Sequence, residues 1–96
     1  MTVYLIARME ITNQDRFSDY VAKAPAIFAK HGGVYLGGGV PETLEGPTEG
    51  RRIAVIEFPD RAAADAYYND PDYEPVRAIR WGATQSEIIL VDGYEG

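Results

Sequence analysis

The fold is decided by the stretch His31-Gly32-Gly33-Val34-Tyr35-Leu36-Gly37-Gly38-Gly39. Gly32 or Gly33 can take the left-handed backbone conformation that closes a helix, because neither carries a Cβ. The run Gly37 to Gly39 lets a backbone or a ligand come close, or lets a strand fray into a loop. The stretch therefore predicts the end of a helix, a turn and then a short strand.

Upstream of this stretch, the sequence predicts a strand followed by an amphipathic helix. Residues 3–9 are apolar at both odd and even positions, which is typical of a strand buried on both faces. Asn13 is a good helix N-cap, and an apolar stripe with a helical period follows it as far as His31-Gly32. Because Pro25 lies inside that stripe, we expect a kink or a restart of the helix near Ala24.

Downstream, the pattern predicts a second strand at 34–38, a loop at 39–50 and a third strand at 51–58. Asp60 caps a second helix over 62–67, which Asn69-Asp70-Pro71 interrupts. The helix restarts at Asp70-Pro71 or around Asp72 and runs to about Trp81, where Gly82 breaks it. We expect a last strand at 87–92, with residues 93–96 frayed or docked on a neighbour.

The order strand, helix, strand, strand, helix, strand predicts one α+β domain over 1–96 with a ferredoxin-like βαββαβ fold. Its four-stranded antiparallel sheet would carry both helical segments on one face. Tyr4, Ile6, Ile53, Val55, Ile88 and Leu90 leave neither face of this sheet polar. An apolar patch of that kind is larger than a soluble monomer usually tolerates, so we expect a homodimer packed sheet on sheet.

Composition excludes several classes of function. The chain has 96 residues, a net charge of −6, no cysteine and one histidine. An acidic chain is a poor partner for nucleic acid, and these counts leave no disulfide and no Cys/His zinc site. The triple glycine is not followed by the lysine and helix start of a phosphate loop. The chain also lacks a signal pattern and a long apolar run. We therefore expect a cytoplasmic protein with no metal, no cofactor and no membrane partner.

Several motifs occur in an order and spacing that resemble a family of small bacterial proteins, the domain of unknown function thirteen-thirty. The motifs are His31-Gly32-Gly33-x-Tyr35, Leu44-Glu45-Gly46, Ile56-Glu57-Phe58-Pro59, Tyr67-Tyr68-Asn69-Asp70-Pro71-x-Tyr73, Arg80 and Val91-Asp92-Gly93. The resemblance covers almost the whole chain. It implies the dimeric α/β barrel superfamily, in which two ferredoxin-like protomers join their sheets. Since that superfamily holds cofactor-free monooxygenases, isomerase-like enzymes, dye peroxidases and stress-responsive proteins, it implies a dimer and a pocket rather than one reaction.

Two residues are candidates for proton transfer. His31 is the sole imidazole, with an ordinary pKa of about 6.5, so it can act as a general acid or base. The alternative is that it caps the last carbonyls of its helix. Glu57 interrupts an apolar strand and is either a structural ion pair at the barrel seam or a pocket carboxylate with a raised pKa. Arg8, Arg51, Arg52 and Arg80 are its candidate partners.

The aromatic side chains and Arg80 are candidates for ligand binding. Tyr35, Tyr67 and Trp81, with Tyr68 and Tyr73, fill either a core and an interface or the wall of a pocket for a planar ligand. Arg80 can hold a carboxylate of the ligand or pair with Glu57 or Asp92. Asp70, Asp72 and Glu74 lack the rest of a calcium loop, and acids at a helix start explain them better.

These observations leave two functions open. The first is a small dimeric protein that binds a metabolite in a pocket beside the sheet. The second is a cofactor-free enzyme, monooxygenase-like or isomerase-like, that acts on a small apolar or aromatic acid. In the second, His31 or Glu57 moves a proton and Arg80 binds the anion. The two differ in one geometric requirement, because the enzyme needs those three side chains in one cavity.

Overall fold

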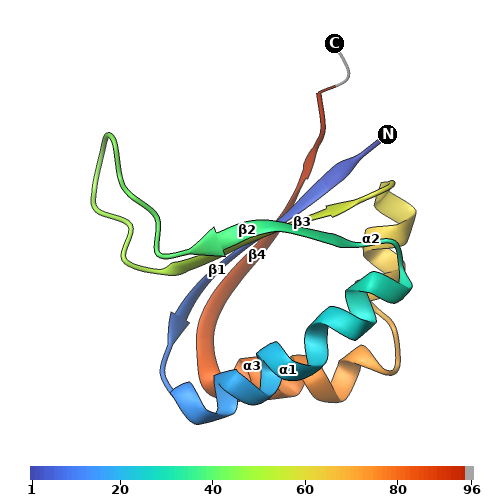
Figure 1. The fold of residues 1–96 in the computed structure, drawn as a ribbon, viewed down its shortest axis with the longest axis horizontal. Coiled ribbons are helices and arrows are strands. Elements are labelled where there is room, and N and C mark those ends of the chain that lie inside the picture. Colours follow the sequence, from blue (N-terminus) through green and yellow to red (C-terminus); the bar gives the residue numbers. More distant parts are fainter. Residues whose placement is uncertain (95–96) are drawn as a thin grey trace.

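The computed structural model describes residues 1–94 and has the predicted order of elements. The elements are β1 (Val3–Ile11), α1 (Gln14–Lys30), β2 (Val34–Gly39), β3 (Arg52–Phe58), α2 (Arg61–Tyr68), α3 (Tyr73–Ala83) and β4 (Thr84–Asp92). The strands form one antiparallel sheet in the order β2-β3-β1-β4. The helices lie on one side of it (Figure 1). This is the ferredoxin-like α+β fold, with α2 and α3 in place of the second helix.

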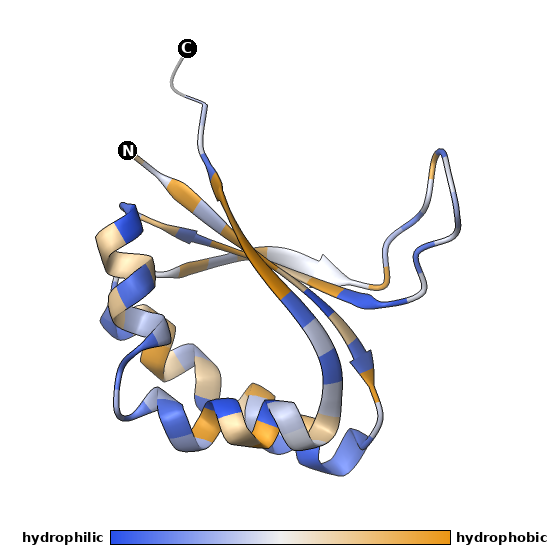
Figure 2. Ribbon diagram, turned by 180° about the vertical axis from the view of Figure 1, so that it is seen from behind, coloured by the Kyte–Doolittle hydropathy of each residue, from blue (hydrophilic) through white to orange (hydrophobic). Residues whose placement is uncertain are grey.

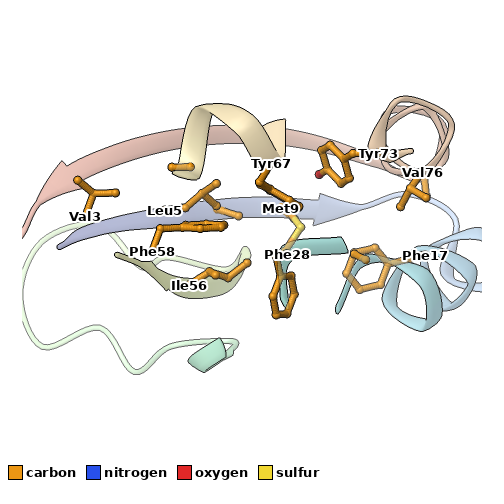
Figure 3. Packing of buried hydrophobic residues seen from close by; sticks show 14 residues of the cluster. Val3, Leu5, Met9, Phe17, Phe28, Ile56, Phe58, Tyr67, Tyr73 and Val76 are labelled. Carbon is orange, nitrogen blue, oxygen red and sulfur yellow. The ribbon is translucent and has the colours of Figure 1, made fainter. Parts of the chain in front are cut away.

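The core lies between the helices and the inner face of the sheet (Figure 3). Alternate residues of β1 form its floor, because side chains two apart on a strand share a face. Val3, Leu5, Ala7 and Met9 are each at most 5% exposed. In register beside them on β3 lie Phe58, Ile56 and Ala54. The helices contribute the buried side chains Phe17, Ala24, Phe28, Ala64, Tyr67, Tyr73 and Val76.

The outer face of the sheet is open in the single chain. Tyr4 and Ile6 of β1 are only partly buried. Ile89, Val91 and Val34 are 41%, 42% and 55% exposed. Figure 2 shows that hydrophobic residues dominate the half of β4 nearer the C-terminus. Within one chain β1 is therefore buried on one face, and the expected burial of its second face would need another molecule.

The helix ends are formed largely by the residues that the sequence indicated. Asn13 Oδ1 accepts the backbone N–H of Arg16 at 3.1 Å, and Asp60 Oδ1 accepts that of Ala63 at 2.8 Å. α1 ends at Lys30 with His31 as its C-cap, and Gly32 follows with a φ of 78°. A Cβ on Gly33 would lie 2.7 Å from the carbonyl oxygen of Phe28, so this position admits only glycine.

Three predicted boundaries were wrong, each for a physical reason. α1 continues through Pro25, because one missing backbone donor does not outweigh its packing in the core. α3 continues through Gly82 to Ala83, and β4 begins at Thr84 rather than at 87. The Ala83 carbonyl accepts the backbone N–H groups of Thr12 and Asn13, which fixes this corner of the fold. Gly82 makes room for a neighbour, since a Cβ there would lie 2.6 Å from Nη1 of Arg16.

The triple glycine lies within β2 rather than in a frayed loop. A register shift occurs between Tyr35 and Gly37. The backbone of Gly38 passes so close to the Ile53 carbonyl and the Tyr35 hydroxyl that a Cβ would collide with both. At the other end of the chain, the Gly93 N–H donates to the Thr2 carbonyl at 2.8 Å, and residues 95–96 lie outside the described part. Within residues 1–94, no helix combines the length and apolar character that a membrane crossing requires.

Candidate functional site

A cavity of about 560 Å³ lies between the inner face of the sheet and the helices. Most of its lining is apolar: Leu5, Ala7 and Met9 come from β1, and Phe17, Ala24 and Phe28 come from α1. Its lining also includes Val21 and Tyr35, which are 47% and 51% exposed and mark where the cavity reaches the surface. A cavity of this size and lining is typical of a site for a small, largely apolar molecule.

Tyrosine side chains supply most of the polar groups of this cavity. Tyr20, Tyr67, Tyr68 and Tyr73 all line it. The hydroxyls of Tyr20 and Tyr73 are hydrogen-bonded at 2.7 Å, and the rings of Tyr67 and Tyr73 have centroids 4.4 Å apart. Burial, and then the proximity of Tyr73, raises the pKa of Tyr20; burial, and then Tyr20 and Tyr73, raises that of Tyr67. The hydroxyls of Tyr20 and Tyr67 therefore stay protonated at neutral pH and can act as hydrogen-bond donors.

Arg80 lies close to these tyrosines without lining the cavity. It is 2% exposed, and Nη1 donates to Ser86 Oγ at 2.5 Å. Its Nε and Nη2 are buried and make no hydrogen bond within residues 1–94. The carboxylates named as candidate partners lie elsewhere, because Asp92 pairs with Arg61 at 2.9 Å and Glu57 is on the outer face. Arg80 is thus a buried cation beside the hydroxyls of Tyr20 and Tyr73.

The other predicted ligand-binding residues differ in where they lie. Tyr35 and Tyr67 both line the cavity. Trp81 does not line it and is 60% exposed. The guanidinium of Arg77 stacks over the Trp81 ring at 5.1 Å from its centroid and over Tyr68 at 4.9 Å. Trp81 therefore covers Arg77 at the surface of α3.

His31 lies at the end of α1, outside the cavity lining. Its Nε2 is 2.7 Å from Oδ2 of Asp70, and the same oxygen is 2.6 Å from Nζ of Lys30. Hydrogen bonds from Lys30, and then from His31, hold the pKa of Asp70 well below its usual range. The imidazole thus has an orienting partner that the sequence did not reveal, and this partner is a carboxylate rather than the last helix carbonyls.

Glu57 lies on the outer face of the sheet, opposite Tyr4 on β1 and Val34 on β2. Within residues 1–94 its carboxylate makes no ion pair, because Arg51 pairs with Glu49 at 2.8 Å and also with Glu87. His31, Glu57 and Arg80 consequently occupy three separate places, and none of them lines the cavity.

Sequence reasoning passed over two residues of this region. Tyr20 falls on the apolar stripe of the first predicted helix, and a hydroxyl on such a stripe signals a polar contact in the core. Asp70 was assigned only to a helix start. It does accept the backbone N–H of Asp72 at 2.8 Å, but its main partners are Lys30 and His31. No His, Asp or Glu side chains within 1–94 cluster in a way that could hold a metal ion.

Comparison with known proteins agrees with this fold. The model of a family described as a domain of unknown function (DUF1330) matches residues 2–94. No curated protein matches the chain. RPA0582, a protein of unknown function from Rhodopseudomonas palustris, is similar in structure, with a TM-score of 0.83 and 18% identity over 99% of this chain and 84% of that one.

Two further structures are informative. A dimeric ferredoxin-like protein of unknown function from Jannaschia sp. CCS1 has a TM-score of 0.79 and 16% identity over 97% of this chain and 100% of that one. SnoaB, a cofactor-independent oxygenase from Streptomyces nogalater, has a TM-score of 0.74 and 16% identity over 99% of this chain and 95% of that one. At such identities the likeness concerns the fold alone.

Proposed function

The chain belongs to the DUF1330 family over residues 2–94, and on that premise we propose that it is a homodimeric protein that binds a small, largely apolar metabolite between its sheet and its helices. The observation that carries the proposal is the cavity of about 560 Å³, whose apolar floor and roof come from β1 and α1. In this proposal Tyr35 and Tyr67 contact the ligand, and Arg80 acts on it through neighbouring hydroxyls. His31 supports the fold through Asp70.

The homodimer part of the proposal rests on the open outer face of the sheet. Exposed Ile89, Val91 and Val34 lie on it, and a second copy packed against it would remove them from water. The ferredoxin-like relative from Jannaschia sp. CCS1 is described as dimeric, which supports this arrangement. A cytoplasmic location and the absence of a nucleic-acid partner stay predictions from the acidic composition and sequence pattern.

A second candidate function, a cofactor-free enzyme acting on a small aromatic acid, is favoured by one observation. The cavity brings tyrosine hydroxyls together beside the charge of Arg80, and such donors can stabilise an oxyanion that forms during a reaction. SnoaB, a cofactor-independent oxygenase, has this fold. Oxygen consumption by the purified protein with an aromatic hydroxy acid, without any added cofactor, would support the enzyme over the binder.

The proposed binding site is tested by filling the cavity. Ala24 is buried in α1 and lines the cavity, so Ala24→Leu puts three further carbon atoms where a ligand would lie. A clash with the ligand that costs about 1.4 kcal/mol or more gives about tenfold or greater loss of affinity. We expect that loss for the neutral fluorescent probe N-phenyl-1-naphthylamine, measured by its emission.

The matched control is Ala26→Leu, at an exposed position of the same helix that does not line the cavity. It should bind the probe as the unmodified protein does, and far-ultraviolet circular dichroism should show both variants folded. Equal binding by a folded Ala24→Leu variant, or no binding by the unmodified protein, would argue against a site in this cavity.

A further inference from the structure

Arg80 is a buried cation that no described carboxylate accompanies. Its side chain is 2% exposed, it takes part in no ion pair within residues 1–94, and only Nη1 has an acceptor, Ser86 Oγ. An isolated charge costs free energy when it leaves water, and proteins normally offset that cost with a buried partner of opposite charge. No side chain within residues 1–94 supplies the negative charge that would balance Arg80. This points to a ligand as the source of that charge.

The hydroxyls of Tyr73 and Tyr20 connect this cation with the cavity. Both tyrosines line the cavity, and their oxygens are 2.7 Å apart. Both tyrosines lie close to the guanidinium. Because a guanidinium carries only donors, it turns the hydroxyl lone pairs toward itself and their protons away from it. The hydroxyl of Tyr67 lies near the same pair. The bond between Tyr20 and Tyr73 uses one of their two protons, so the other can be donated to an acceptor in the cavity.

We propose that the ligand of this cavity carries one weakly acidic oxygen, as a phenol or an enol does, and is held as its anion by the hydroxyls of Tyr20 and Tyr73 with the charge of Arg80 behind them. This inference rests on the proposed binding function and specifies the class of ligand. Arg80 is a positioning residue in it, because it acts through the tyrosines and does not touch the ligand.

The geometry favours a single anionic oxygen over a carboxylate. A carboxylate is best bound by the two-pronged face of an arginine, but Arg80, the arginine beside the tyrosines, does not line the cavity. Arg52 does line the cavity, but it is an exposed residue whose guanidinium lies over the Phe17 ring, 5.6 Å from the centroid. The tyrosines present hydroxyl donors close together, which suits one oxygen atom. Burial raises the pKa of Tyr20, so this hydroxyl keeps its proton and a more acidic ligand oxygen loses its own. The aromatic rings and apolar walls around the hydroxyls suit a flat, unsaturated body.

The test uses 4-nitrophenol, whose colour reports its ionisation, beside two compounds of similar shape. 4-Nitroanisole cannot ionise, and 4-nitrobenzoate carries a carboxylate. A site that prefers the phenolate at least tenfold over the neutral form lowers the apparent pKa of bound 4-nitrophenol by about one unit. We expect that shift in an absorbance titration, and at least tenfold weaker binding of 4-nitroanisole.

Substitutions test whether Arg80 and Tyr73 cause the pKa shift of bound 4-nitrophenol. Arg80→Met removes the charge and keeps most of the side-chain volume, so the pKa shift should be lost while 4-nitroanisole binds unchanged. Tyr73→Phe removes one hydroxyl and should reduce the shift, and it decides the matter if Arg80→Met does not fold. Arg61→Met is the control, because Arg61 is 54% exposed, pairs with Asp92 at 2.9 Å and does not line the cavity. It should retain the shift.

The outcomes separate this inference from the proposed function. Binding of 4-nitroanisole with no pKa shift for bound 4-nitrophenol would overturn the inference and leave the cavity as a binding site. Tighter binding of 4-nitrobenzoate than of 4-nitrophenolate would also overturn it, in favour of a carboxylate ligand. Failure of all three compounds to bind would count against both, and a shift that survives Arg80→Met and Tyr73→Phe would contradict the assigned residues.

Discussion

Asp70 joins the end of one helix to the start of another. Its Oδ2 lies 2.6 Å from Lys30 Nζ and 2.7 Å from His31 Nε2 at the end of α1, and its Oδ1 accepts the N–H of Asp72 ahead of α3. One carboxylate therefore fixes the His31 ring and the break between α2 and α3 at once. The only imidazole of the chain has a structural partner in this contact, which lies outside the cavity.

The charge of Asp70 predicts a pH-dependent contribution to stability. Hydrogen bonds from Lys30, and then from His31, depress the pKa of Asp70. A carboxylate with a depressed pKa contributes stability that is fully present above its unfolded pKa, about 3.9, and is lost as pH falls through the folded pKa. We expect Asp70→Asn to lower the thermal unfolding midpoint at neutral pH, and the deficit to shrink as pH falls below about 4.

Asp72→Asn is the control, because the Asp72 side chain is 76% exposed and its ion pair within residues 1–94 is with Lys30 alone, at 3.1 Å. Circular dichroism melts at a series of pH values should show a small and nearly constant effect for it. A deficit of Asp70→Asn that stays the same at every pH would mean that the shape of the side chain, and not its charge, stabilises this junction.

α1 shows how packing can override a local signal. The helix remains continuous across Pro25, which cannot donate to the carbonyl of Val21 one turn earlier. The buried residues Phe17, Ala24 and Phe28 hold both halves of the helix against the sheet. α1 therefore forms although Pro25 disfavours a helix. Pro25 should lower the free energy of unfolding of the protein.

Replacement of that proline gives a measurable prediction. Pro25→Ala restores the backbone hydrogen bond and removes an interior proline that costs about 3 kcal/mol, while the more flexible unfolded chain takes back up to about 1 kcal/mol. We expect the free energy of unfolding in urea to rise by about 2–3 kcal/mol.

Pro75→Ala serves as the comparison, since Pro75 is in the first turn of α3, where backbone N–H groups have no partner within the helix. It should leave the free energy of unfolding unchanged or slightly lower. An unchanged free energy of unfolding in Pro25→Ala would show that Pro25 does not destabilise the folded protein.

The junction between α3 and β4 is the other place where the sequence pattern predicted the wrong boundaries. Gly82 and the polar residues that follow it favour a loop, but the chain passes from Ala83 straight into Thr84 of β4. Thr84 Oγ1 donates to the Arg80 carbonyl at 2.8 Å, which satisfies an acceptor at the end of the helix. This corner holds Arg80 in the core, so the position of the candidate site depends on it.

For the whole molecule, the main question is what covers the outer face of the sheet. We expect light scattering at micromolar concentration to give twice the mass of the chain. Ile89 is 41% exposed and lies on that face, opposite Ile6 in the sheet. Ile89→Glu should therefore yield a monomer, because the dimer would have to bury a carboxylate without a partner.

Ala22→Glu, at an exposed position of α1, places the same charge on the opposite side of the molecule and should remain dimeric. A monomeric unmodified protein, or an unchanged dimer in a folded Ile89→Glu variant, would show that the outer face does not form the interface.

Local patterns were enough to predict the order of elements, the two side-chain caps at Asn13 and Asp60, the end of α1 and the apolar second face of the sheet. These features follow from residues within a few positions of one another, so period and capping chemistry reveal them. The cavity, the hydroxyl pair of Tyr20 and Tyr73, and the ion pair of His31 with Asp70 came only from the folded structure. The partners in those two contacts are 53 and 39 residues apart, and no pattern in the chain records which distant side chains the folding of the sheet brings together. The burial of Arg80 is of the same kind, since an arginine near the end of a helix is usually solvated, and only the packing of α3 against α1 and β4 removed this one from water.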